Sequence, residues 1–208
     1  MSQSATGKIC VIGAGSSGLA AVKALGDAGL TFDCFEMGSG IGGNWRYDND
    51  NGRSAAYDSL HIDTSKGRMA FADLPMPESY PHYPHHSQVL AYFEQYAELF
   101  GLTPKITFRT RVERVAREDG GYRVETRDLE RGETRSALYR AVLVCNGHHW
   151  QPKLLRFPGS FDGDSLHSRT YRSAESLRDG RVLIVGIGNS GADIACDAAP
   201  VARRTLLA

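Results

Sequence analysis

The chain has no excess of either charge and no long apolar run. Its 24 Lys and Arg residues balance its 24 Asp and Glu residues, so the formal net charge is zero. A neutral chain creates no general attraction for nucleic acid, and we expect no nucleic-acid partner. The first apolar run, residues 9–12, is too short for a signal-peptide core, and no run approaches the ~18 residues of a membrane span. The sequence therefore predicts a cytoplasmic protein without a membrane span.

Paired cysteines and metal-binding motifs are also missing. The four cysteines, Cys10, Cys34, Cys145 and Cys196, form no C-x-x-C pair, which disfavours a disulfide reductase and a zinc site. Three of them lie in short apolar runs, which predicts free, buried thiols in a reducing compartment. The seven histidines include no H-E-x-x-H spacing, so we predict no metal site. No G-x-S-x-G motif marks a hydrolase nucleophile.

Glycine, by contrast, is plentiful, at 23 of 208 residues, where a share of about 7% is usual. The segment Gly13-Ala14-Gly15-Ser16-Ser17-Gly18 reads G-x-G-x-x-G, between a predicted strand at 8–12 and a predicted helix at 17–28. A second predicted strand, residues 32–36, ends at Glu36. Strand, helix and strand within so short a stretch predict a βαβ unit of a parallel sheet.

Each part of this unit has a physical role in binding a dinucleotide. Gly13 permits the tight turn, Gly15 lets the backbone approach a pyrophosphate, and Gly18 lets the helix pack close to the strand. The helix N-terminus offers N–H groups to the phosphates, and Glu36 can accept hydrogen bonds from ribose hydroxyls. Because this carboxylate repels a 2′-phosphate, FAD or NAD fits here better than NADP. The alternative is a structural turn without a ligand.

A second glycine turn repeats the pattern near the end of the chain. Gly186-Ile187-Gly188-Asn189-Ser190-Gly191 follows a predicted strand at 181–185 and opens a predicted helix from about residue 190. A further strand is predicted at 205–207. Two such turns imply two dinucleotides brought face to face, the layout for hydride transfer between a nicotinamide and a flavin.

The stretch between the two turns mixes loop, helix and hairpin patterns. Residues 38–86 are irregular and rich in glycine and proline, and so long a loop favours a functional role. A helix is predicted at 87–100. Alternating strands at 111–115 and 122–126 flank a glycine turn, which predicts an antiparallel hairpin. A buried strand is predicted at 141–144.

Three further segments resemble the flavin-containing monooxygenases, a branch of the class B flavoprotein monooxygenases. Gly42-Gly43-Asn44-Trp45 is similar to the segment that passes along the flavin, and residues 63–66 with 73–77 resemble the family's flavin-facing loop. Residues 161–171, from Phe161 through Gly163 and His167 to Tyr171, fit the family fingerprint F-x-G-x-x-x-H-x-x-x-Y/F. The likeness runs along nearly the whole chain.

The resemblance implies an α/β fold. Its first domain, residues 1–172, is a Rossmann-like FAD-binding domain with a parallel sheet and an antiparallel β-hairpin region. Residues 173–208 begin a second Rossmann-like domain, for NADPH. The implied FAD contacts are the first glycine turn with Glu36, and then Gly43, Asn44, Trp45, Asp63, Thr64, Ser65 and Val112. The implied NADPH contacts are Gly186, Gly188, Asn189, Ser190 and Gly191.

The resemblance also implies a reaction. NADPH reduces FAD, O2 adds to form a C4a-hydroperoxyflavin, and one oxygen passes to a soft nitrogen or sulfur nucleophile, a small amine or sulfide. Asp63 is the implied catalytic residue, and a homodimer is one expected assembly. A Baeyer–Villiger-type monooxygenase is the alternative enzyme, although such an enzyme is expected to have Trp where Tyr171 stands.

Two departures from the family pattern bear on this prediction. Many members carry Asn where Asp63 stands, and an ionised aspartate accepts hydrogen bonds but cannot donate them. Family members are also much longer than 208 residues. We therefore expect the chain to be a fragment, a truncated gene product or one piece of a split protein, and a non-catalytic FAD-binding remnant is the third hypothesis.

Overall fold

The structure, a computed structural model, describes residues 6–154 and 157–208. The helices and strands, in chain order, are β1 (Thr6–Ile12), α1 (Ser16–Asp27), β2 (Phe32–Phe35), α2 (Lys66–Met69), α3 (His86–Leu99), β3 (Ile106–Thr107), β4 (Thr110–Glu118), β5 (Gly121–Asp128), β6 (Thr134–Val144), β7 (Arg181–Ile184), α4 (Asn189–Ala198) and β8 (Arg204–Leu207). Short 3-10 helices span Gly43–Trp45, Thr103–Lys105, Ser168–Thr170 and Ala174–Leu177.

The chain packs into two compact units that alternate along the sequence. The first comprises residues 1–54 and 90–148, and the second comprises residues 55–89 and 149–208. These units do not test the predicted domains, 1–172 and 173–208, which stay predictions. Residues 1–5 and 155–156 of the first predicted domain lie outside the described residues.

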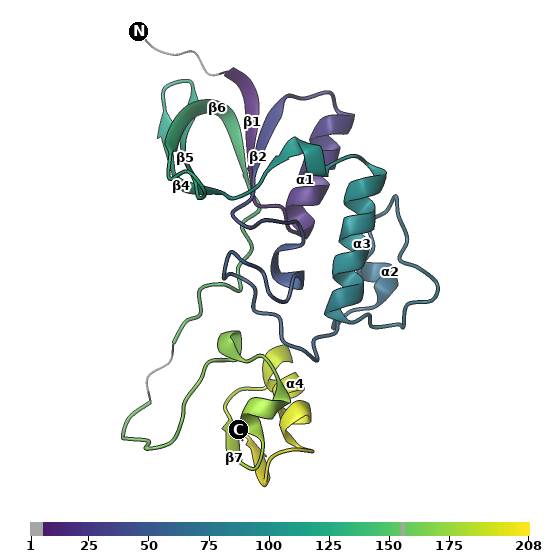
Figure 1. Cartoon of the computed structure of the whole chain (residues 1–208), viewed down its shortest axis with the longest axis vertical. Coiled ribbons are helices and arrows are strands. Elements are labelled where there is room, and N and C mark those ends of the chain that lie inside the picture. The colour runs from purple at the N-terminus through teal and green to yellow at the C-terminus, as the bar shows by residue number, and fades with distance from the viewer. Residues whose placement is uncertain (1–5, 155–156) are drawn as a thin grey trace. The chain divides into compact units, whose positions relative to one another are not determined.

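The first unit is built on one six-stranded sheet, in the order β3-β2-β1-β6-β5-β4 (Figure 1). The strands from β3 to β6 pair in parallel, while β6, β5 and β4 form an antiparallel meander. The predicted parallel sheet with an antiparallel hairpin region is therefore confirmed.

Apolar burial explains the parallel half of this sheet. Cys10 and Val11 in β1 are fully buried, as expected of a strand covered on both faces. Helix α1 lies along β1 and β2 (Figure 1), and its buried stripe includes Leu19 and Val22. This spacing of three residues places both side chains on the face that meets the sheet.

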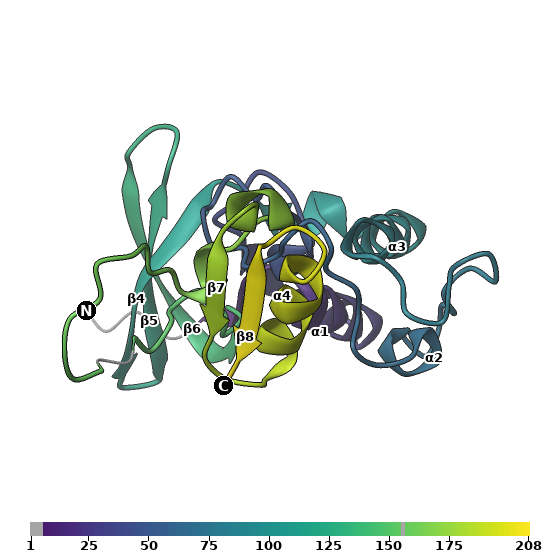
Figure 2. The ribbon, with the colours of Figure 1, turned by 90° about the horizontal axis from the view of Figure 1, so that it is seen from below.

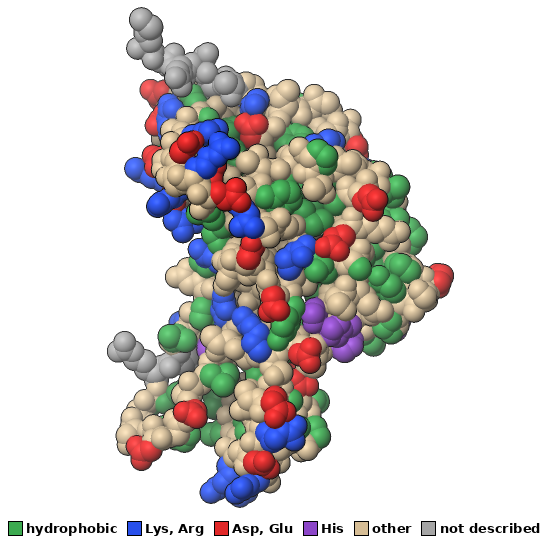
Figure 3. Space-filling model, in the orientation of Figure 1, with side chains coloured by type: hydrophobic (Ala, Val, Ile, Leu, Met, Phe, Trp, Pro, Cys, Tyr) green, Lys and Arg blue, Asp and Glu red, His purple; other side chains and the backbone are tan. Residues whose placement is uncertain are grey.

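Strand β6 belongs to both halves of the sheet. Its first part, up to Tyr139, pairs antiparallel with β5, and its last part, from Tyr139 on, pairs parallel with β1. The strand is therefore longer than the predicted 141–144. At the tip of the β4–β5 hairpin, Gly120 has a φ of 86°, a left-handed conformation that suits glycine. Lys and Arg side chains gather with Asp and Glu side chains on the visible surface over β4–β6, which is a charged face (Figure 3).

The second unit contains the parallel pair β7–β8, with α4 against one face of the pair (Figure 2). Its core is a cluster of five buried residues, Tyr57, Tyr171, Ile184, Ile194 and Ala198. Tyr57 comes from the predicted loop and Tyr171 from the predicted fingerprint, so both segments help to bury α4. The strand–helix–strand pattern predicted around the second glycine turn is confirmed by this arrangement.

Candidate dinucleotide-binding sites

The first glycine turn has a backbone that only glycine accommodates at two of its positions. Gly13 has a φ of 98°, and a Cβ there would lie 2.5 Å from the carbonyl oxygen of Cys145. A Cβ on Gly18 would lie 1.9 Å from the carbonyl oxygen of Gly13. The turn therefore brings helix α1 as close to strand β1 as the G-x-G-x-x-G spacing predicts.

The N-terminus of α1 faces this turn without a capping side chain. Gly15 is the N-cap residue, it makes no side-chain cap hydrogen bond, and the first turn of α1 contains no acidic residue. Ser16 and Ser17, both predicted FAD contacts, form the first residues of α1. A helix N-terminus of this kind offers free N–H groups and the positive end of the helix dipole, both of which favour the binding of an anionic phosphate.

Glu36 follows β2 and reaches the first glycine turn, as predicted from its spacing. Its side chain is only 5% exposed. Its Oε2 accepts a hydrogen bond from Ala14 N at 2.8 Å, and its Oε1 accepts one from Gly38 N at 2.7 Å. Asn51, which sequence reasoning missed, donates a third hydrogen bond from Nδ2 to Oε1 at 3.1 Å. These bonds fix the carboxylate beside the turn that it was predicted to serve.

The predicted flavin-flanking segment also lies against the first turn. Gly42 has a φ of 106°, and its N–H donates to the carbonyl oxygen of Ala14 at 3.0 Å. The next residue, Gly43, lies so close to Gly15 that a Cβ on Gly43 would be 3.0 Å from the Gly15 Cα. Asn44 and Trp45 complete the short 3-10 helix that begins at Gly43. Residues 43–45 are thus brought to the helix N-terminus.

Val112 lies on β4, where the β4–β5 ladder shifts register between Val112 and Arg114. Its side chain packs against the hydrophobic cluster of Cys10, Val124 and Tyr139. That side chain therefore has a packing role, and a contact of Val112 with a cofactor stays a prediction.

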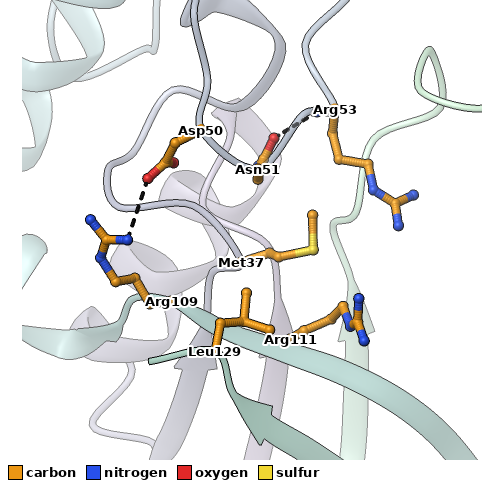
Figure 4. A pocket seen from close by; sticks show the side chains of 7 residues that line it. All are labelled: Met37, Asp50, Asn51, Arg53, Arg109, Arg111 and Leu129. Atoms are coloured by element: carbon orange, nitrogen blue, oxygen red, sulfur yellow. Dashed lines mark hydrogen bonds and ion pairs between the residues drawn. The ribbon is translucent and has the colours of Figure 1, made fainter. Parts of the chain in front are cut away.

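A cavity of about 370 Å³ opens at Met37, the residue that follows Glu36 in the chain. Its lining residues are Met37, Asp50, Asn51, Arg53, Arg109, Arg111 and Leu129 (Figure 4). Arg109 lies 3.7 Å from Asp50, and both stand on the opposite side of the cavity from Arg53 and Arg111. The hydrogen bond from Ser39 N to Asp50 lowers the pKa of that carboxyl, and Arg109 adds to the effect. Its polar rim and central Met37 suit a flat, partly polar group.

The second glycine turn repeats the geometry of the first. Gly186 has a φ of 103°, and a Cβ on Gly191 would lie 2.2 Å from the carbonyl oxygen of Gly186. Gly188 is the N-cap of α4, where no side chain caps the helix and the first turn holds no acid. Asn189 and Ser190 begin that helix. In both turns, the third glycine thus lets the helix N-terminus pack against the carbonyl oxygen of the first glycine, where a side chain would clash.

Asp63 lies in the second unit, at the second glycine turn. Its Oδ2 accepts a hydrogen bond from Asn189 Nδ2 at the start of α4. Thr64 and Ser65 follow it, and Ser65 is the N-cap of α2. Lys66 Nζ then donates to three carbonyl oxygens between residues 77 and 80. The predicted flavin-facing loop is therefore tied both to α4 and to the proline-rich segment after it.

Two aspartates on α4 hold the helix to the rest of the second unit. Asp193 accepts a hydrogen bond from the Tyr57 hydroxyl at 2.5 Å. Asp197 accepts from Ser59 Oγ at 2.5 Å and from the Tyr171 hydroxyl at 2.7 Å. Burial, together with these hydrogen bonds, raises the pKa of both tyrosines, which therefore stay neutral donors. Sequence reasoning missed this cluster. The signal in the sequence is the pair Asp193 and Asp197, which lie four residues apart and therefore on one face of the helix.

The cysteines are reduced, but they are not all buried. All four are free; Cys10 and Cys34 are buried, and burial raises the pKa of each thiol to about 12. Cys196 is exposed, because it lies on the outer face of α4. Within residues 6–154 and 157–208, no three His, Cys, Asp or Glu side chains group as a metal site. Over the same residues, no helix has the length and hydropathy to cross a bilayer.

Comparison with known proteins decides the family. The sequence profile of the family described as "Flavin-binding monooxygenase-like" matches residues 6–208. The chain belongs to this family. It is 43% identical, over 96% of its length, to flavin-containing monooxygenase 5 of Oryctolagus cuniculus, and it spans 39% of that relative. This confirms the resemblance seen in the sequence.

Two solved oxygenase structures share the fold of this chain. The S-allyl-L-cysteine S-oxygenase of Allium sativum superposes with a TM-score of 0.88 at 32% identity, over 97% of this chain and 50% of that one. A flavin-containing monooxygenase of Stenotrophomonas maltophilia gives 0.83 at 33% identity, over 96% and 56% of the two chains. The chain therefore corresponds to about half, or less, of the family members that it matches.

The fingerprint of this flavin-binding monooxygenase-like chain has a structural explanation. His167 Nδ1 accepts a hydrogen bond from Arg169 N at 3.0 Å, which caps the 3-10 helix Ser168–Thr170. That helix delivers Tyr171, only 1% exposed, to the cluster against α4. The histidine therefore shapes the turn, and the tyrosine locks it to the helix of the second glycine turn.

Proposed function

We propose that this chain is the dinucleotide-binding portion of an FAD- and NADPH-dependent monooxygenase that oxygenates soft nitrogen or sulfur nucleophiles. One observation carries the proposal: two glycine turns with the same steric device each present a helix N-terminus that no side chain caps, and Glu36 stands beside the first. A carboxylate at the ribose suits FAD, which has no 2′-phosphate. Family membership supports the same assignment.

The residues of the first turn fit FAD. The absent side chains of Gly13, Gly15 and Gly18 leave a backbone cradle at the start of α1. The Glu36 carboxylate has about four acceptor positions, of which the structure fills three, so Oε2 keeps one for a ribose hydroxyl. The cavity beside Met37 is the place for the adenine, and residues 43–45 would flank the remainder of the cofactor.

FAD, reduced by NADPH and exposed to O2, would supply the oxygen-transferring chemistry. The chain's own residues bind and orient. The α1 N-terminus would hold the pyrophosphate of FAD, and the α4 N-terminus, with Asn189, would hold that of NADPH. Asp63, hydrogen-bonded to Asn189, would fix the amide of that side chain at the second turn.

The other expected properties remain parts of this proposal. They are a small amine or sulfide as substrate, O2 as co-substrate, a cytoplasmic location and a homodimer. A Baeyer–Villiger enzyme is less favoured, because the Tyr171 hydroxyl is engaged with Asp197, a bond that fits the tyrosine form of the fingerprint. A non-catalytic FAD-binding protein would share the first turn without using the second.

The visible spectrum of the purified chain tests the proposal. We expect a bound flavin band that bleaches when NADPH is added without oxygen and returns when air is admitted. Trimethylamine, a thioether and cyclohexanone are then compared as substrates in separate assays. Bound flavin that NADPH does not bleach would favour the non-catalytic alternative, ketone turnover would favour the Baeyer–Villiger one, and a chain that binds no flavin would refute the proposal.

A further inference from the structure

We propose that Asn49 and Asn51 are positioning residues of the FAD site, which brace Glu36 against the segment at Gly43. This inference rests on the proposed function, because it concerns how FAD is held. Neither asparagine stands in a motif of the sequence. Both lie in the loop that follows the 3-10 helix Gly43–Trp45, within the first unit.

Asn51 holds the end of the brace at Glu36. Its Nδ2 donates to Glu36 Oε1 at 3.1 Å, while its Oδ1 accepts from Arg53 N at 2.8 Å. Its own N–H donates to Asn49 Oδ1 at 3.2 Å. Both polar atoms of the amide are engaged, so its orientation is fixed with the donor toward the carboxylate. Asn51 also lines the cavity at Met37 (Figure 4).

Asn49 holds the other end, at the flavin-flanking segment. It is 6% exposed, and its Nδ2 donates to the carbonyl oxygen of Gly43 at 3.0 Å. Its Oδ1, besides accepting from Asn51, would lie 2.7 Å from a Cβ placed on Gly38. Ser54, also buried, donates from Oγ to the carbonyl oxygen of Asn44 at 2.8 Å and extends the brace.

This arrangement sets the direction in which Glu36 presents its acceptor. Gly38 N and Asn51 Nδ2 together fill Oε1, whereas Oε2 receives only Ala14 N. The one remaining acceptor position is therefore on Oε2, the oxygen at the glycine turn. Without the Asn51 amide, the carboxylate could rotate or turn its second acceptor elsewhere. Asn51 thus orients the Glu36 carboxylate that would contact the ribose, and Asn49 orients the backbone of the segment predicted to flank the flavin.

The two asparagines should differ in the part of the cofactor that they serve. Asn51 acts on the ribose contact, which ADP and FAD share, whereas the amide of Asn49 acts on Gly43, in the segment predicted to pass along the flavin. We therefore expect Asn51→Ala to weaken the binding of both ADP and FAD, and Asn49→Ala to weaken the binding of FAD alone. Asn51→Asp keeps the size of the side chain but places a second carboxylate beside Glu36, so its effect should exceed that of Asn51→Ala.

The experiment titrates the full 208-residue chain, stripped of flavin, with FAD and with ADP, following FAD fluorescence or the heat of ADP binding. We expect Asn51→Ala to raise the Kd of both ligands about tenfold, the effect of losing one hydrogen bond to a charged group. Asn49→Ala should raise the Kd of FAD about tenfold and change that of ADP less than about twofold. Gln95→Ala, which removes an exposed carboxamide of α3 in the same unit, is the matched control and should change neither.

Each other outcome overturns the inference. A wild-type chain that binds FAD normally, with Asn51→Ala and Asn49→Ala unchanged, refutes the brace but leaves the proposed function standing. Equal loss of both ligands in the two variants, with a lowered unfolding midpoint of the ligand-free chain, assigns the asparagines to folding alone. A wild-type chain that binds neither ligand refutes the proposed function, and the brace with it.

Discussion

Removal of the Tyr171 hydroxyl should measure how firmly the fingerprint holds α4. In Tyr171→Phe the ring still fills its buried place, so the change deletes only the donor to Asp197. A hydrogen bond to a charged acceptor contributes about 1.5–3 kcal/mol. Ser59 still donates to Asp197 in the variant, so the carboxylate keeps a partner and the loss should fall to about 1 kcal/mol.

Urea unfolding in a Trp45→Phe background isolates this effect, because Trp150 then reports on the second unit alone. Asp197→Asn and the double variant complete a thermodynamic cycle. We expect a coupling of about 0.5–1 kcal/mol between the hydroxyl and the carboxylate. A coupling below about 0.3 kcal/mol would refute the claim that this bond holds the helix.

Three further predictions follow from steric contact, burial and charge. Gly18→Ala should destabilise the chain by about 1–3 kcal/mol in urea unfolding and abolish flavin retention, because its Cβ would overlap the Gly13 carbonyl; unchanged retention would contradict the close approach. With a chromogenic disulfide at pH 8, Cys196 should react within minutes and Cys10 only on unfolding, as its thiol has a pKa raised to about 12; a fast-reacting Cys10 in the folded chain would argue against its burial. Burial and the Asp33 hydrogen bond raise the pKa of Tyr139, so the stability that its neutral form contributes is complete below about pH 10 and declines at higher pH. Tyr139→Phe should flatten this decline, and a decline of equal slope in both proteins would contradict the assignment.

The sequence was sufficient where the chemistry is local. Both glycine turns, the strands before them and Glu36 were predicted, because each depends on residues within about one βαβ unit. The hairpin was predicted for the same reason: its alternating strands meet across a two-residue turn.

Contacts between distant segments could not be predicted in this way. Tyr57 and Asp193 are 136 residues apart, and no periodicity relates a loop tyrosine to one acid on a helix. The flavin contact of Asp63 stays a prediction, and its hydrogen bond to Asn189 could not be foreseen, because the two residues are 126 positions apart. Asn49 and Asn51 look like ordinary turn residues, and only the folded loop reveals which carbonyl and carboxylate they meet.

The double pairing of β6 limits where this fold can gain or lose residues. Around Tyr139, strand β6 pairs in parallel with β1 and antiparallel with β5. Inserting a single residue there would move the side chains that follow it to the opposite face of the sheet and would disturb both pairings at once. The hairpin tip at residues 119–120 lies beyond the last residue pair of the β4–β5 ladder, so an insertion there would shift no strand pairing. Length variation among homologues, and any tag or reporter inserted by design, should therefore accumulate at that tip and avoid the middle of β6.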